Sequence, residues 1–208
     1  MAESALFVSN LEKAIEPANE TATHILDAAY ALFLEFGLRK TTMEDVAKRA
    51  KIGRITVYRH YADKPTLFQA VVMRECFRAM QDVERRLAQI HDMEERFVSG
   101  FVIVVNGARK HPLISRLLET EPEWLLPYLT TKGEAMLRFG SQYVASTLRQ
   151  DIDQSLLATT NIDLLAEMLW RLLHSILLTP GGLMAPPKDD AALRHVAKSF
   201  LLPLVMGK

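Results

Sequence analysis

Cysteine is nearly absent from this chain, because Cys76 is the only one among its 208 residues. A single cysteine excludes a disulfide framework and a zinc site built from several thiolates, and it suits a reducing cytoplasm. The six histidines are scattered without the paired spacing of metal ligands, and no glycine-rich phosphate loop follows a strand-like run. We therefore expect no catalytic site, no metal and no cofactor.

Alternation of apolar and polar residues is not sustained in this sequence, which argues against a β-sheet. Apolar residues recur instead at the three- and four-residue spacing of helices. Helices are predicted over residues 65–91, 94–109, 112–120, 161–178 and 189–205, with an interrupted or kinked helix over 122–150 near Pro127 and Gly133. The expected fold class is all-α.

The segment TMEDVAKRAKIGRITVYRHY, residues 42–61, has the pattern of two short helices joined by a tight turn. Thr42 can cap the first helix, and Asp45, three residues on, completes a capping box. Gly53 interrupts the helical spacing, which resumes at Arg54. Because the second helix is too short to be stable alone, it must pack on a scaffold.

Two flanking helices provide that scaffold. An apolar stripe over residues 25–36 predicts a helix that Gly37 can end in a left-handed conformation. Asp63 is placed to cap the following helix, with Pro65 in its first turn. Val57 is expected to face the core that these helices close.

Positive charge is concentrated in this region. Residues 39–64 contain eight cations and three anions, a net charge of +5, so the rest of the neutral chain carries −5. A local cationic patch attracts the phosphate backbone of nucleic acid, whereas an acidic remainder does not. Charge, turn and helix spacing coincide, which favours a DNA-reading helix-turn-helix over a merely solvated face.

These residues resemble the TetR-type one-component transcriptional repressors. The resemblance covers about residues 25–71 and rests on FLEFGLRKTTMEDVAKRAKIG and TVYRHYADKPTLF. In that family Thr-aliphatic-Tyr-x-His-aromatic-x-x-Lys is the recognition helix running into the next helix, and it occurs here over residues 56–64. The usual turn, Ala-Gly-Val-Ser, is replaced by Ala50, Lys51, Ile52 and Gly53. Glycine is an acceptable N-cap, but the serine hydroxyl and any phosphate contact through it are missing.

Residues near the N-terminus of a recognition helix meet base edges in the major groove. We therefore expect base reading by Arg54, Ile55 and Arg59, with arginine suited to guanine and isoleucine to a thymine methyl. The resemblance implies phosphate contacts by Thr42, Thr56, Tyr58, His60 and Lys64. For Tyr58 a partly buried core position is the alternative, and for His60 a neutral surface histidine.

The predicted helix over residues 161–178 is strongly apolar, yet Asp163, Glu167 and Arg171 form a polar line along it. This line argues against a membrane span and leaves a wide apolar face to be covered. We expect a second subunit and the last helix to cover part of it in a four-helix bundle, as the resemblance also implies. The expected interface residues are Leu165, Met168, Leu169, Leu172, Leu193, Val196 and Phe200.

Large apolar side chains are frequent in the middle helices. They suit the lining of a cavity, although a packed helical core needs the same residues. The resemblance favours a pocket for a small hydrophobic or amphipathic effector, lined by Phe97, Phe101, Val104, Trp124, Tyr128, Met136, Phe139, Tyr143, Trp170 and His174. For His174, a satisfied core histidine is the alternative.

The resemblance implies a ligand-responsive repressor that binds a palindromic double-stranded DNA operator as a homodimer in the cytoplasm and is released by its effector. The alternative is a helical small-molecule-binding or interaction protein whose basic patch does not read DNA. The expected domains are an N-terminal extension over 1–20, a DNA-binding domain over 21–68 and an effector-binding and dimerisation domain over 69–208. The extension is acidic, which argues against a DNA-contacting arm, and it lacks the pattern of a signal peptide.

Overall fold

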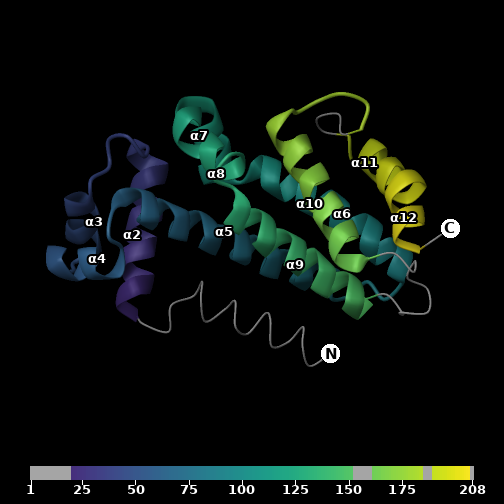
Figure 1. Cartoon of the computed structure of the whole chain (residues 1–208), viewed down its shortest axis with the longest axis horizontal. Helices are drawn as coiled ribbons and strands as arrows, with labels where there is room; N and C mark the ends of the chain where they lie inside the picture. The colour runs from purple at the N-terminus through teal and green to yellow at the C-terminus, as the bar shows by residue number, and fades with distance from the viewer. Residues whose placement is uncertain (1–19, 152–160, 185–188, 207–208) are drawn as a thin grey trace. The chain divides into compact units, whose positions relative to one another are not determined.

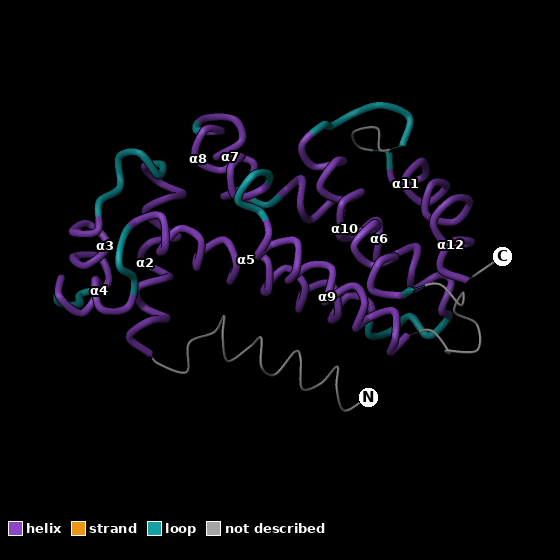
Figure 2. The backbone as a smooth tube through the Cα atoms, in the orientation of Figure 1, coloured by secondary structure: helices purple, strands orange, loops and turns teal. Residues whose placement is uncertain are grey.

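The computed structural model describes residues 20–151, 161–184 and 189–206, and within these ranges the chain is helical and contains no β-strand (Figures 1 and 2). The all-α prediction is thereby confirmed. The predicted extension over residues 1–20 lies outside this part of the chain, except for Glu20. The helices are α2 Glu20–Phe36, α3 Met43–Ala50, α4 Arg54–His60, α5 Lys64–Leu87, α6 Met93–Lys110, α7 Pro112–Thr120, α8 Pro122–Leu129, α9 Glu134–Asp151, α10 Ile162–Leu178, α11 Asp190–Val196 and α12 Leu202–Met206.

The described residues form two compact units. The N-terminal unit contains residues 20–79 and 110–132, and the C-terminal unit contains residues 80–109 and the described part of 133–206. Helices α7 and α8 thus group with the first helices, which differs from the predicted division at residue 68. Compact units and functional domains need not coincide, so the predicted domain division stays a prediction.

The core of the N-terminal unit begins on α2. Its buried residues, among them Ile25, Leu26 and Phe33, recur at helical spacing, and the Phe33 ring meets the Phe68 ring of α5 edge-on at 5.9 Å. Gly37 follows the last residue of α2 with φ +84°, the left-handed conformation expected of a helix-ending glycine. This packing supplies the scaffold that the short helices α3 and α4 require.

Helix α5 begins as expected and ends earlier than expected. The Asp63 carboxylate accepts a hydrogen bond from the Thr66 amide at 2.8 Å, which confirms the predicted cap. The helix stops at Leu87 rather than His91, because a turn closes from the Ile90 amide to the Leu87 carbonyl at 2.9 Å. The Arg96 guanidinium donates to the same carbonyl at 2.6 Å and completes the end of the helix.

The C-terminal unit is built around α6, α9, α10 and α12. Leu148 of α9, Leu165 of α10 and Val205 of α12 belong to one buried apolar cluster, against which Phe97 of α6 packs. Helix α10 runs along α9, and the buried Gly140 of α9 leaves the space that the Trp170 ring of α10 occupies. No helix in the described part of the chain is long and apolar enough to cross a membrane.

The interruption expected near Pro127 and Gly133 is confirmed. Two separate helices, α8 and α9, occupy residues 122–151, and the Pro127 carbonyl accepts the amides of Thr130 and Lys132 at 3.3 and 2.7 Å at the end of α8. One further helix prediction needs correction. The last helix, expected as one piece, is interrupted by a π-helical segment at Ala197–Leu201. Pro203 lacks the amide that would bond the Ser199 carbonyl, which accounts for the irregular turn before it.

Candidate nucleic-acid interface and effector region

Helix α3 has the start that its sequence predicts. The Asp45 amide donates to Thr42 Oγ1 at 3.2 Å, and Asp45 Oδ2 accepts from the Thr42 amide at 3.0 Å, so the capping box is complete. The hydrogen bonds that the Thr42 hydroxyl and then the Thr42 amide donate to its carboxylate hold the pKa of Asp45 below its usual value. The cap fixes where α3 begins and therefore how the turn after it is presented.

The turn between α3 and α4 contains a strained lysine. Lys51 has φ 57° and ψ 38°, the left-handed region in which glycine is usual, and its amide is bonded to the last turn of α3. Gly53 then caps α4 in an extended conformation without a side-chain hydrogen bond. The predicted turn is confirmed, and lysine occupies the position that a glycine would fill without strain.

Replacing Lys51 by glycine should raise the free energy of unfolding. A left-handed residue with a Cβ costs about 1 to 2 kcal/mol, whereas glycine loses roughly 0.5 to 1 kcal/mol through its greater freedom when unfolded. The net gain for Lys51→Gly is then about 0.5 to 1 kcal/mol, measurable by urea denaturation. Lys48→Gly, at an exposed position inside α3, is the control and should lose about 1 kcal/mol. A loss in both variants would contradict strain at Lys51.

The recognition helix α4 exposes an unusual apolar side chain. Ile55 is 86% exposed, whereas Val57 is fully buried beneath the helix as predicted. Arg54 pairs with Glu44 at 2.8 Å and lies over the Tyr58 ring at 5.4 Å. An ion pair between exposed side chains is weak and can be exchanged for a stronger partner.

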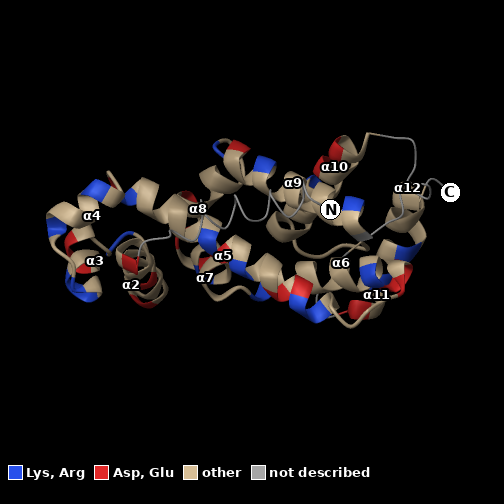
Figure 3. Ribbon diagram, turned by 90° about the horizontal axis from the view of Figure 1, so that it is seen from below, with Lys and Arg blue, Asp and Glu red and all other residues tan. Residues whose placement is uncertain are grey.

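The cations expected around this helix lie on the surface. In Figure 3 the blue ribbon segments on both α3 and α4 mark their lysine and arginine positions. Of the eight cations in residues 39–64, seven are exposed: Arg39, Lys40, Lys48, Arg49, Lys51, Arg54 and Arg59. Arg49 pairs with Glu35 at 2.7 Å, and a groove of about 580 Å³ beside it is lined in part by Phe36, Lys40 and Lys48. The charge therefore faces solvent, where it can meet phosphate.

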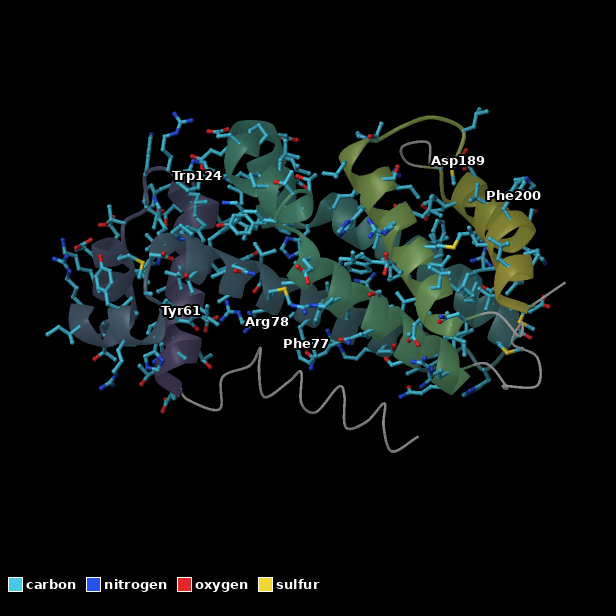
Figure 4. All side chains as sticks on the ribbon, in the orientation of Figure 1. Tyr61, Phe77, Arg78, Trp124, Asp189 and Phe200 are labelled. Atoms are coloured by element: carbon cyan, nitrogen blue, oxygen red, sulfur yellow. The ribbon has the colours of Figure 1, made fainter. Side chains whose placement is uncertain are left out.

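Lys64 is the exception among the residues expected to contact phosphate. Its ammonium donates to the carbonyls of Leu38 at 2.9 Å and Thr41 at 3.1 Å. The same ammonium lies 5.2 Å from the ring centre of Trp124, a residue labelled in Figure 4. Burial lowers the pKa of Lys64, while the nearby Glu121 carboxylate acts in the opposite direction. The Lys64 ammonium therefore binds backbone carbonyls of its own subunit. The sequence pattern did not indicate this structural role.

The other residues expected at phosphate are more accessible. Thr42 and Tyr58 are exposed, whereas Thr56 and His60 are half-buried. The His60 ring lies 6.3 Å from the Tyr61 ring, so it belongs to the edge of the packed unit. The Thr42 hydroxyl donates to Asp45 at 2.6 Å, and its oxygen also accepts the Asp45 amide.

The residues expected to line an effector pocket divide between the two units. Trp124 and Tyr128 lie on α8 in the N-terminal unit, where Tyr128 meets Phe68 edge-on at 5.3 Å. The C-terminal unit contains the remaining eight: Phe97, Phe101, Val104, Met136, Phe139, Tyr143, Trp170 and His174. The structure therefore does not gather all ten predicted residues in one unit.

Within the C-terminal unit, several of these residues are parts of the packed core. Phe139 and Met136 are buried, and Tyr143 donates from its hydroxyl to Glu84 at 2.7 Å. The His174 ring lies 5.3 Å from the Trp170 ring, and burial, with a smaller contribution from Arg171, lowers the pKa of His174. The environment of this histidine thus favours its neutral form. A groove of about 380 Å³ on this unit has other, mostly polar walls, among them Glu95, Arg194 and Lys198.

The residues expected at a subunit interface also divide into two groups. Leu165, Leu193 and Val196 are buried inside the subunit, so their assignment to an interface is corrected. Leu169 and Leu172 are half-buried. Met168 is 54% exposed and Phe200 is 62% exposed, as are their neighbours one turn away, Leu164 at 54% and Leu204 at 53%. Leu164 and Leu204 were not among the expected interface residues, because helical spacing alone does not say which side of a broad apolar helix faces inward.

A capped helix, a tight turn and a short cationic helix with its apolar tip in solvent, all held on a helical scaffold, define a helix-turn-helix DNA-binding protein. The chain belongs to the TetR family of bacterial regulators. It matches the family description "Bacterial regulatory proteins, tetR family" over residues 25–71 and "Bacterial Tetracyclin repressor, C-terminal domain" over residues 92–198.

Individual relatives agree with this assignment. The HTH-type transcriptional regulator MT1294 of Mycobacterium tuberculosis (strain CDC 1551) is 24% identical over 184 residues, 88% of this chain and 85% of the relative. The TetR family repressor AlkX of a Dietzia strain shares the fold with a TM-score of 0.61 at 21% identity, covering 88% of this chain and 94% of AlkX. SmeT of Stenotrophomonas maltophilia, in complex with triclosan, has a TM-score of 0.53 at 25% identity, covering 90% and 92%.

Proposed function

We propose that this protein is a repressor that binds a palindromic DNA operator as a homodimer and is released by a small hydrophobic or amphipathic effector. The exposed Ile55 carries the proposal. This β-branched side chain lies at the start of the recognition helix and is 86% exposed. Packing within its own subunit therefore does not explain why an apolar residue stands here. The major groove offers it a thymine methyl group as a partner.

Base reading is assigned to Arg54, Ile55 and Arg59. Arg54 stands at the N-terminus of α4, where its pairing with Glu44 and its position over Tyr58 orient the guanidinium before DNA arrives. A guanine offers two acceptors that arginine can bind together, with about 1 to 3 kcal/mol of discrimination. Arg59 is exposed farther along the same helix.

Phosphate contacts are assigned to Thr42, Thr56, Tyr58 and His60, beside the exposed lysines of this region. Such contacts fix the orientation of the recognition helix and carry no sequence information. Lys64 is left out of this set because its ammonium is bonded to backbone carbonyls of its own subunit.

Dimerisation is assigned to the exposed apolar residues Leu164 and Met168 of α10 and Phe200 and Leu204 near the C-terminus. Members of each pair stand four residues apart and so lie one above the other on their segments. Burying them against a second copy removes apolar surface from water and creates the two-fold symmetry that a palindromic operator requires.

The effector is assigned to the C-terminal unit, among the aromatic and aliphatic residues of α6, α9 and α10. Its hydrophobic character follows from that lining, and SmeT, which binds triclosan, shows that a relative accepts such a molecule. The units are joined through α5 and the connections at residues 109–110 and 132–133. A 100-fold loss of operator affinity requires about 2.7 kcal/mol of coupling through these connections.

The proposal can be tested with DNA selected by the wild-type protein from a random duplex library. Affinity for the selected sequence should fall steeply between about 50 and about 200 mM salt. Arg54→Ala should reduce the preference for one guanine position by about tenfold, because the bidentate contact is lost. Arg85→Ala, an exposed arginine outside the helix-turn-helix, is the control and should change neither quantity. Salt-independent binding without sequence preference would favour the alternative, a helical interaction protein with an unused basic patch.

A further inference from the structure

The loop between α2 and α3, residues 37–42, is held by residues distant in the sequence as well as by local hydrogen bonds. It leads directly into the Thr42 cap of α3 and so determines how that helix enters the helix-turn-helix. Within the loop, the Thr41 hydroxyl donates to the Gly37 carbonyl at 2.8 Å. Two further anchors, Lys64 on α5 and Glu121 at the junction of α7 and α8, come from residues far away in the sequence.

Glu121, between α7 and α8, binds the backbone amides of the loop with its carboxylate. Its Oε2 accepts from the Leu38 amide at 2.6 Å and from the Arg39 amide at 3.1 Å, and the residue is only 9% exposed. Hydrogen bonds from amides to a carboxylate are stronger than those between neutral groups. A buried carboxylate without these donors would be costly, so loop and junction stabilise one another.

Gly37 is shaped to admit this carboxylate. A Cβ atom at this position would lie 2.5 Å from Glu121 Oε1, closer than atoms can approach, and the φ of +84° already disfavours a side chain. The close approach of Glu121 therefore depends on the absence of a side chain at residue 37.

Lys64 binds the carbonyl side of the same loop. Its ammonium donates to Leu38, Thr41 and, at 3.5 Å, Arg39. The same ammonium lies over the ring of Trp124, three residues after Glu121. Amides bound by Glu121 and carbonyls bound by Lys64 together restrain the loop from both sides of its peptide groups.

We propose that Glu121 is a positioning residue for DNA binding: it holds the loop of residues 37–42 and thereby sets the orientation of α3 and, through the turn, of α4. This inference rests on the proposed DNA-reading function. Helix α4 is too short to hold itself in place, so its direction follows that of α3. The junction between α7 and α8 is thus a point from which the presentation of Arg54 and Ile55 can be changed.

The neighbouring contacts do not perform the same task. Glu123 binds the Arg39 guanidinium at 2.8 Å, but both side chains are more than half exposed and the contact does not hold the backbone. Arg116 donates to the Glu35 carbonyl at 3.3 Å, upstream of the loop. Glu123, in the first turn of α8 and two residues after Glu121, therefore offers a matched control, because its carboxylate does not bind the backbone of the loop.

Amide hydrogen exchange tests the contact itself. In Glu121→Ala the amides of Leu38 and Arg39 should exchange at least about tenfold faster than in the wild type, because their charge-assisted bonds are lost. Amides in the middle of α2 should be unchanged, which separates local release from global destabilisation. Glu123→Ala should leave Leu38 and Arg39 as they are. Wild-type exchange at both amides in Glu121→Ala would overturn the proposal.

DNA affinity tests the consequence, using the duplex selected by the wild-type protein and a temperature at which circular dichroism shows every variant folded. Glu121→Ala should bind at least about tenfold more weakly, Glu121→Gln should recover part of the loss because its amide oxygen still accepts, and Glu123→Ala should stay within about twofold. If Glu121→Ala does not fold, amide exchange and DNA affinity are both measured on Glu121→Gln, for which we expect smaller changes in the same direction. Equal affinity in folded variants whose loop amides are released refutes the positioning role, whereas a wild-type protein that selects no DNA refutes the proposed function instead.

Discussion

A protein carrying Met168→Glu and Phe200→Glu should be monomeric and should bind a palindromic operator at least about 100-fold more weakly than the wild type. Both side chains are more than half exposed on the surface that we assign to dimerisation. Two carboxylates in place of apolar groups would be buried without partners in the dimer, which costs several kcal/mol. Since a dimer binds two half-sites together, its loss removes the gain from a second, effectively intramolecular contact.

Sedimentation should show the change of mass, and binding to half-site and full palindromic duplexes should show the change of affinity. The half-site affinity of the variant should equal that of the wild type, because α4 is untouched. Leu183→Glu is the control, since Leu183 is 97% exposed in a loop of the same unit and should tolerate a charge. A double variant that remains dimeric places the interface elsewhere, and a loss of half-site binding shows that the fold itself was damaged.

Gly140→Ala should destabilise the protein by roughly 3 kcal/mol, an unusually large effect for a single methyl group. The added Cβ would lie 2.0 Å from an atom of the Trp170 ring, so α9 and α10 must separate or the indole must leave its place. Trp170 is buried and has little room to move. Close-packed cores resist such additions because neighbouring side chains already occupy the space.

Gly107→Ala is the matched control. Gly107 lies in α6, and a Cβ there would have no atom within 4 Å, so the higher helix propensity of alanine should stabilise the protein by about 0.5 to 1 kcal/mol. Guanidinium denaturation of both variants gives the comparison. Adding Trp170→Leu to Gly140→Ala should cost less than the sum of the two single changes, because the smaller side chain relieves the clash. Strict additivity, or stability of Gly140→Ala near that of the wild type, would contradict the packing of the Trp170 ring against Gly140.

Much of the helix-turn-helix could be predicted because its signals are local. The Thr42–Asp45 capping box, the left-handed Gly37 and the Asp63 cap each involve residues at most a few positions apart, so spacing along the chain reports them directly. The start of α10 after Asn161, whose side chain caps it, is local in the same way. The irregular turn before Pro203 was harder to predict, because a proline can be accommodated within a helix or near its end.

The positions of individual side chains required tertiary structure. Leu164 and Leu165 are equally apolar, and helical spacing alone did not show which of them faces the core. Packing against α9 and α12 buries Leu165 and leaves Leu164 in solvent. Lys64 matched a pattern for phosphate contact, yet its ammonium lies against the loop that precedes α3.

The sequence by itself determined that this chain is all-α, where its DNA-reading helix begins, and that its positive charge surrounds that helix, because these properties depend on short-range periodicity, caps and composition. Only the tertiary structure decided which apolar residues stay exposed. It also brought Glu121 to the amides of Leu38 and Arg39, 83 and 82 residues away. Such contacts follow from how whole helices pack, and no spacing rule within one helix contains that information.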